Sequence, residues 1–124
     1  RFYERHYTKV DPKHFEPIVD GMWRGVNVGG TSTAARLEGL DVCGKTGTAE
    51  NPRGRDHSTF LSFAPKDNPK IAISVYVENG GFGASAALPI ASLLEEYYLT
   101  DTIRRPALLE HIKNMNIYYP SYDR

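Results

Sequence analysis

The chain has 124 residues, the length of one ordinary domain, and its 15 basic and 15 acidic side chains give zero net charge, which argues against a general nucleic-acid-binding protein. Its single cysteine, Cys43, excludes an internal disulfide and a cysteine-based zinc cluster. No apolar run approaches the length that a helix needs to cross a bilayer, about 20 residues, so we expect the isolated chain to be soluble.

The N-terminal part of the chain predicts a loop followed by one helix. Residues 1–10 mix aromatic and charged side chains without a clean period, which indicates a loop or an edge strand. Asp11 and Pro12 are typical of a helix N-cap and a first helical residue. Pro17 removes an interior backbone hydrogen bond, so we expect regular helix from about Glu16 to the glycine pair that ends it. The buried stripe of this helix is expected to comprise Phe15, Ile18, Val19, Met22 and Val26.

The middle of the chain predicts one short helix and an antiparallel meander. Residues 31–39 are expected to form the helix, with Thr31 or Ser32 as its cap. Alternating or β-branched runs follow, separated by short turns rich in Asn, Asp, Gly and Pro. The first strand is expected to begin with residues 40–43 and to run into Lys45, and the other two strands are expected at residues 58–64 and 71–77.

The C-terminal part predicts two more helices after a glycine-rich break at residues 79–83. Residues 84–99 are expected to form the longer helix, with Pro89 tolerated in its first turns. Thr102 is expected to cap the last helix, and residues 116–124 are either an ordered tail or a mobile end. The expected stripes are Leu88, Ala91, Leu94, Glu95 and Tyr98 on the longer helix, and Leu108, Leu109, Ile112 and Met115 on the last one.

These elements predict an α+β fold in which helices pack on an antiparallel sheet of about three strands. We expect residues 1–124 to form one partial domain. Its segments are an N-terminal loop or edge strand (1–10), the helix, strands and long helix (11–100), and a C-terminal helix and tail (101–124).

Lys45 belongs to two overlapping motifs with different chemistry. Residues 39–46 match the phosphate-binding P-loop pattern G-x-x-x-x-G-K-[ST], whereas Lys45-Thr46-Gly47 is an element of serine acyl-transferases. A P-loop needs a strand before its glycine-rich turn and a helix directly after the lysine. Here the segment before the motif is helix-like, and Gly47 and Pro52 interrupt any helix after it. A nucleotide-binding function is therefore the least favoured interpretation.

The acyl-transferase interpretation is supported by matches along most of the chain. From about residue 11 to residue 99, the chain resembles the C-terminal part of the transpeptidase domain of a class B penicillin-binding protein, most closely the elongation type, penicillin-binding protein 2. The matching runs are Asp20-Gly21-Met22-Trp23, Gly30-Thr31, Gly44-Lys45-Thr46-Gly47-Thr48-Ala49-Glu50, Phe60-Leu61-Ser62-Phe63-Ala64-Pro65, and the strand 71–77 before the long helix.

The resemblance implies a substrate-binding role for Lys45, Thr46, Gly47 and Thr48 on an edge strand that lines the active-site groove. Lys45 would supply positive charge and the threonine hydroxyls hydrogen bonds to a substrate carboxylate. Gly47 would allow close approach of the substrate, and the Thr48 amide would face the reacting carbonyl as half of an oxyanion hole. An extended peptide can pair with such an edge.

By the same resemblance, the full enzyme cross-links peptidoglycan stem peptides at the periplasmic face of the inner membrane. It would work with the cell-wall elongation machinery, and β-lactams would acylate it. The family needs a serine in S-x-x-K and an S-x-N element, and neither pattern occurs here. We therefore expect this chain alone to be inactive and its anchor to be absent. An exposed sheet edge would favour a homodimer. A non-catalytic module of the same fold, with residues 102–115 and the tail as a contact surface, is the alternative function.

The remaining candidate residues favour structural roles. Cys43 is expected to be a small buried strand residue, with a reactive thiol as the alternative. The histidines have no metal-ligand spacing, so we expect neither a metal nor a cofactor. His57 follows Asp56 as a general base would, but no nucleophile lies near it in sequence, so we favour a role in the turn before the strand. The histidines are His6, His14, His57 and His111.

Overall fold

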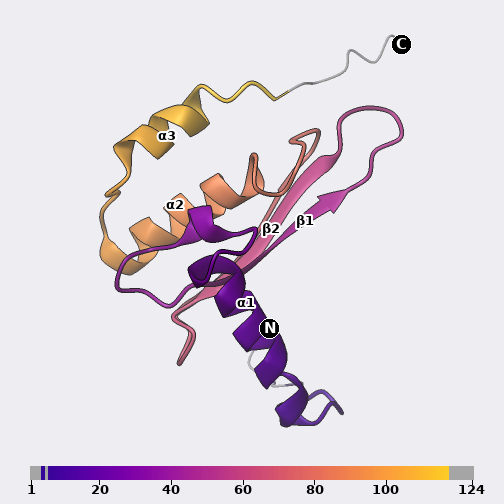
Figure 1. Cartoon of the computed structure of the whole chain (residues 1–124), viewed down its shortest axis with the longest axis vertical. Coiled ribbons are helices and arrows are strands. Elements are labelled where there is room, and N and C mark those ends of the chain that lie inside the picture. The colour runs from indigo at the N-terminus through magenta and orange to yellow at the C-terminus, as the bar shows by residue number, and fades with distance from the viewer. Residues whose placement is uncertain (1–3, 5, 118–124) are drawn as a thin grey trace.

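A computed structural model describes residue 4 and residues 6–117, and Figure 1 shows helices packed on a small sheet. The elements in chain order are the 3-10 helix η1 (Pro12–His14), α1 (Glu16–Asn27), the 3-10 helix η2 (Thr33–Ala35), β1 (Cys43–Ala49), β2 (His57–Ala64), β3 (Ile71–Val77), α2 (Ala87–Thr100) and α3 (Pro106–Lys113).

The sheet is antiparallel with strand order β1-β2-β3, which confirms the predicted meander. β3 has the predicted bounds, and β2 begins one residue earlier than predicted. β1 begins at Cys43, later than predicted, because Leu37 and Leu40 instead form an isolated bridge around a turn. Gly39 takes a φ of +76° in that turn, a conformation that glycine adopts without strain.

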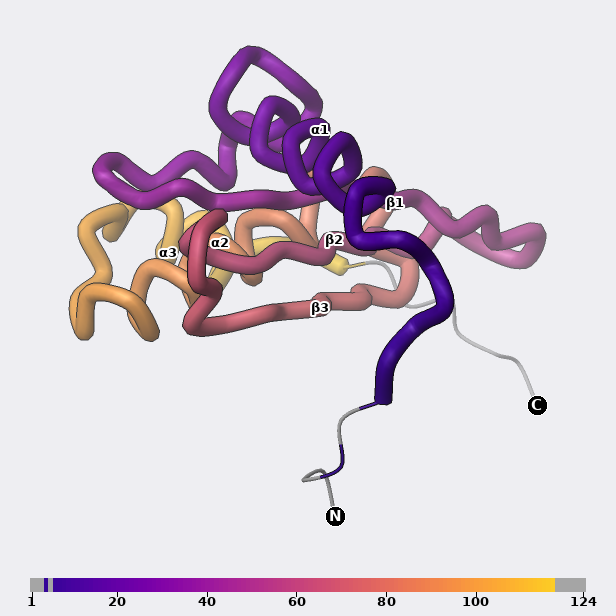
Figure 2. The backbone as a smooth tube through the Cα atoms, turned by 90° about the horizontal axis from the view of Figure 1, so that it is seen from below, coloured from indigo at the N-terminus to yellow at the C-terminus, as the bar shows by residue number. Residues whose placement is uncertain are grey.

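Helix α2 covers one face of the sheet over β2 and β3, whereas α1 lies along β1 (Figure 2). Phe60 of β2 is buried at the centre of this face, in one cluster with Val26 of α1 and Leu88 of α2. A Cβ atom at Gly44 would lie 2.5 Å from Phe60 Cζ, so this glycine makes room for the aromatic ring. Figure 2 shows α1 beside β1, with β2 and β3 following in order. The cluster consists of Val26, Ala35, Leu37, Val42, Phe60, Ala64, Ala87, Leu88 and Ala91.

The start of the chain differs in part from the sequence prediction. Residues 6–10 form no strand, and residues 1–3 and 5 lie outside the described residues. Asp11 does cap a helix, because its Oδ1 accepts a hydrogen bond from the Lys13 amide at 3.0 Å, but the helix is η1. The expected start of the regular helix at Glu16 is confirmed.

The predicted stripe of α1 is only partly correct. Val26 is fully buried, and Val19 and Met22 are half-buried, but Phe15 and Ile18 are exposed. Figure 1 shows the reason, since the N-terminal turns of α1 extend beyond the sheet. A helical period predicts which side chains share a face, but it does not predict how far the opposing surface extends.

The helix predicted at residues 31–39 is wrong in length, because only η2 forms there. Arg36 after it is extended, and Ser32 makes no side-chain capping bond. The Ser32 amide donates instead to the Gly25 carbonyl at 3.1 Å, which ties the start of this segment to α1.

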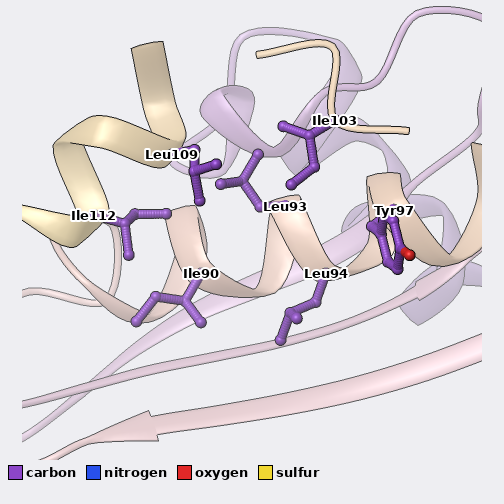
Figure 3. Close-up of a pocket in the computed structure, with 7 residues that line it drawn as sticks. All are labelled: Ile90, Leu93, Leu94, Tyr97, Ile103, Leu109 and Ile112. Atoms are coloured by element: carbon purple, nitrogen blue, oxygen red, sulfur yellow. The ribbon is translucent and has the colours of Figure 1, made fainter. Parts of the chain in front are cut away.

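Helix α2 has two apolar faces, and this explains the errors in its predicted stripe. Leu88, Ala91 and Glu95 are buried against the sheet as predicted, but Leu94 and Tyr98 are 51% and 62% exposed. Leu94 lies on the second face, which forms an apolar groove with α3 (Figure 3). The groove is lined by Ile90, Leu93, Leu94, Tyr97, Ile103, Leu109 and Ile112.

Helix α3 is held by an arginine rather than by the predicted threonine cap. Thr102 bonds locally to Thr100, and α3 begins after Arg105. The Arg105 guanidinium lies 3.3 Å from both carboxylate oxygens of Glu96 and donates to Ser92 Oγ at 2.7 Å. The predicted apolar residues are half-buried, but Met115 lies beyond the end of α3. Residues 118–124 of the predicted tail lie outside the described residues.

Candidate active site

The Lys45-Thr46-Gly47-Thr48 run lies on β1, at an edge of the sheet. Among the described strands, β1 pairs only with β2. Helix α1 lies along the start of its other side, where the Asn27 side chain donates to the Val42 carbonyl at 3.0 Å, and the part from Lys45 onward has no strand partner. Lys45 and Thr48 are exposed, and Thr46 and Gly47 are half-buried. The structure therefore places the four predicted residues together on an accessible strand edge, which is what a peptide-binding strand requires.

Two segments distant in sequence hold the threonine hydroxyls. Thr46 Oγ1 lies 3.2 Å from Thr31 Oγ1, which follows α1. Thr48 Oγ1 accepts a hydrogen bond from the Gly83 amide at 3.4 Å, in the loop before α2. Thr46 and Thr48 are two residues apart and therefore share one face of the strand. The segment after α1 thus positions the Thr46 hydroxyl group, and the loop before α2 positions that of Thr48.

The Lys45 amine folds back onto its own strand. Its Nζ donates a hydrogen bond to the Thr46 carbonyl at 2.6 Å. Backbone groups of residues two apart point to the same side of a strand, so the Thr48 amide lies on the side to which the Thr46 carbonyl points. One strand therefore presents an ammonium group, two hydroxyl groups and a backbone donor over a short distance. This is a donor set suited to an anionic, extended ligand.

Close packing explains two glycines at the site, against backbone at Gly83 and against a side chain at Gly47. A Cβ atom on Gly83 would lie 2.5 Å from the carbonyl oxygens of both Gly47 and Thr59. A Cβ atom on Gly47 would collide with the Thr59 hydroxyl group. The loop before α2 can therefore lie directly on β1 and β2 only because it carries glycine at position 83.

Ser58 fixes the same loop from below. Its buried hydroxyl group donates to the Phe82 carbonyl at 2.8 Å and accepts from the Ala87 amide at 2.9 Å. These bonds join β2 to the first residue of α2. A hydroxyl group that is buried and bonded in this way is not available as a nucleophile.

Thr31 and Gly83 were not predicted as site residues. The sequence singles out Gly30-Thr31 only as part of the family resemblance, and the glycine-rich break at residues 79–83 only as a turn that borders the groove. Nothing local in the sequence shows that these segments meet β1, because the contacts join residues 15 and 35 positions apart. The glycines within residues 79–83 were the one local feature of the sequence that could have indicated close packing of this loop.

Cys43 and His57 have structural roles. Cys43 is fully buried, as predicted, and its burial raises the pKa of the thiol to about 11, which keeps it unreactive. The His57 Nδ1 accepts the Asn79 amide at 3.0 Å, and its ring lies 5.4 Å from that of Tyr76. His57 therefore fixes the end of β3 to β2, in agreement with the structural role that the sequence favoured.

The structure excludes the P-loop interpretation. Gly39 closes the turn between Leu37 and Leu40, and the chain continues after Lys45-Thr46 as strand up to Ala49. A phosphate loop requires a helix N-terminus directly after the lysine, and here that position is occupied by β1.

Within residue 4 and residues 6–117, no helix has the length and apolar composition that crossing a membrane requires. The same residues contain no group of three or more His, Cys, Asp or Glu side chains placed to hold a metal ion. The apolar groove between α2 and α3 contains no residue of β1 and no charged side chain. It therefore cannot be the site of an anionic ligand.

Comparison with known proteins shows which family this sequence and this fold resemble. The sequence model described as the penicillin-binding protein transpeptidase domain matches residues 4–94. The peptidoglycan D,D-transpeptidase MrdA of Haemophilus influenzae is 36% identical over 106 residues, which cover 72% of this chain and 16% of the relative. PbpA of Mycolicibacterium smegmatis, also named as a peptidoglycan D,D-transpeptidase, is 34% identical over 87 residues, covering 67% of this chain and 17% of the relative.

Solved structures agree with the sequence matches. Pseudomonas aeruginosa PBP2 in complex with WCK 5153 superposes with a TM-score of 0.66 and 35% identity, covering 77% of this chain and 21% of that one. The imipenem acyl-enzyme complex of penicillin-binding protein A from M. tuberculosis superposes with a TM-score of 0.65 and 30% identity, with the same coverage. The chain thus spans about one sixth of the length of the curated relatives it matches.

Proposed function

Because the chain belongs to the penicillin-binding protein transpeptidase family, we propose that it is the substrate-holding part of a peptidoglycan D,D-transpeptidase. The observation that carries this proposal is the open edge of β1, where Lys45, Thr46 and Thr48 are presented together. More narrowly, we assign it to the C-terminal part of the domain in a class B enzyme of the elongation type. The similarity to MrdA and to PBP2 supports that assignment.

The substrate would be a stem peptide that ends in D-alanyl-D-alanine. Its terminal carboxylate would be held by the Lys45 amine and by the hydroxyl groups of Thr46 and Thr48, because charge-assisted hydrogen bonds are the strongest available there. Its backbone would pair with the open edge of β1. The Thr48 amide would then stabilise the negative oxygen that develops on the reacting carbonyl.

The reaction needs a nucleophile that this chain does not contain. No serine in the 124 residues is followed by lysine at the third position, and Ser58 is buried and bonded. A serine from another part of the whole enzyme would attack the penultimate D-alanyl carbonyl and form an ester. The terminal D-alanine would leave with a proton. The amine of a second stem peptide would then displace the serine and form the cross-link.

The whole enzyme would lie at the outer face of the cytoplasmic membrane, and β-lactams would acylate the serine that faces this site. The relatives solved with imipenem and with other such drugs support the acylation. We also propose that the whole enzyme works with partner proteins of cell-wall elongation. The isolated chain would associate with itself through the edge of β3 that has no strand partner among the described residues.

Intact-mass spectrometry after incubation with a fluorescent penicillin tests this function. We expect a longer protein that contains these residues to gain one penicillin, on a serine outside them, and the isolated chain to gain none. Heat-denatured protein is the control for non-specific reaction. An adduct on the isolated chain would contradict the missing nucleophile, and no adduct on the longer protein would favour a non-catalytic module.

A further inference from the structure

Among the residues that the structure describes, Glu95 is a carboxylic acid that is buried in the core without a hydrogen-bond partner. It lies in the middle of α2 and is 0% exposed, and neither of its carboxyl oxygens has a hydrogen-bond partner among the described residues. Ser62 of β2 is the polar group that faces it, and the Ser62 hydroxyl group is also without a hydrogen bond. This differs from the adjacent Glu96, which is paired with Arg105.

No charge on the covered face of the sheet offsets an ionised Glu95. The strand register places only Gly, Thr, Ser, Ala, Phe, Ile and Val side chains on that face. Cys43 of β1 lies close enough to Glu95 to interact with it, and its thiol is neutral. On α2 and at the start of α3, Glu96 and Arg105 neutralise one another. A negative charge on Glu95 would therefore be buried and unpaired, which is strongly unfavourable.

We propose that Glu95 is a buried proton switch that couples the docking of α2 on the sheet to pH. With a proton, Glu95 is a neutral side chain that the core accepts. Without the proton, its charge draws water or moves toward solvent, and α2 loosens from β2. Ser62 pairs with Gly44, the residue next to Lys45, so this loosening reaches the strand that carries the candidate site.

The direction of the effect follows from burial. Desolvation raises the pKa of Glu95 to about 7, and the Ser62 hydroxyl group that faces it acts in the opposite direction. In the unfolded chain the carboxyl group has its ordinary, lower pKa, so the folded state binds the proton more tightly. Proton binding by Glu95 stabilises the folded state fully when the pH is below the pKa of this group in the unfolded chain. That stabilisation is lost as the pH rises through the pKa of Glu95 in the folded state, about 7.

Thermal unfolding between pH 5 and pH 8 tests the switch. We expect the Tm of the unmodified chain to fall by about 5–10 °C over this range. The Tm of the variant Glu95→Gln should not fall over this range, because its side chain stays neutral. Glu110→Gln is the matched control, because Glu110 is exposed on α3 and pairs with Lys113, so its Tm profile should follow that of the unmodified chain. Equal slopes in Glu95→Gln and the unmodified chain would overturn the proposal.

A second measurement needs no variant. The carboxyl carbon of Glu95 can be followed by NMR in the unmodified chain, together with the exchange protection of the Ser62 amide on the central strand. We expect the carbon to titrate near pH 7 and the protection factor at Ser62 to fall over the same range. Titration at the pH of an ordinary exposed glutamate would overturn the proposal, whether or not Glu95→Gln folds.

Discussion

In a longer protein that contains this chain, Lys45→Ala is expected to slow acylation by penicillin about 10- to 100-fold. The reason is the loss of a charge-assisted hydrogen bond to the carboxylate, which strengthens as the ligand is fixed for reaction. The Tm should change little, because Lys45 is exposed and its amine bonds only to the adjacent Thr46 carbonyl. The second-order rate constant with a fluorescent penicillin is the quantity to measure.

Two variants make this prediction specific. Lys70→Ala removes an exposed lysine just before β3, away from β1, and should react like the unmodified protein. Lys45→Arg keeps the positive charge, so its rate constant of acylation should lie between those of Lys45→Ala and the unmodified protein. If Lys45→Ala and Lys70→Ala react at the same rate, the carboxylate is not held by Lys45.

Gly83→Ala is expected to destabilise the fold by about 2–3 kcal/mol. The added methyl group would lie 2.5 Å from the carbonyl oxygens of Gly47 and Thr59. Both contacts are with backbone, so relief requires a shift of β1, of β2 or of the loop. The shift would also remove the amide that binds Thr48 Oγ1. Urea unfolding, with the slope m monitored, measures the loss.

The control for this substitution is Gly21→Ala on α1. No atom lies within 4 Å of a Cβ at Gly21, and alanine is the better helix former, so stability should rise by about 0.5–1 kcal/mol. A Gly83→Ala variant as stable as the unmodified chain would show that the loop does not pack on β1 as described.

The strands were the most predictable part of the fold, because their signals are local. β3 is β-branched and bounded by turns, and its bounds were predicted correctly. The helices were harder, since their exposed faces depend on what lies opposite. Phe15 and Ile18 are exposed because no strand lies under them, and Leu94 faces the groove with α3 rather than the sheet.

The candidate site was predictable only where its chemistry lies in one segment. Lys45 to Thr48 follow one another and carry a recognisable motif. Thr31 and Gly83 reach that strand through folding, and no spacing in the sequence shows this. Glu95 was placed correctly in the buried stripe of its helix, but the absence of a partner for its carboxyl group is a property of the packed core.

The central claim is that β1 holds the carboxylate of the substrate. The most direct test is a crystal structure of a longer protein that contains this chain, acylated by penicillin. We expect the drug's carboxylate within hydrogen-bond distance, about 2.7–3.2 Å, of Thr46 Oγ1 and Thr48 Oγ1, with the Lys45 amine adjacent and the acyl oxygen facing the Thr48 amide. A carboxylate held by other residues, with Lys45, Thr46 and Thr48 free of the ligand, would contradict the claim.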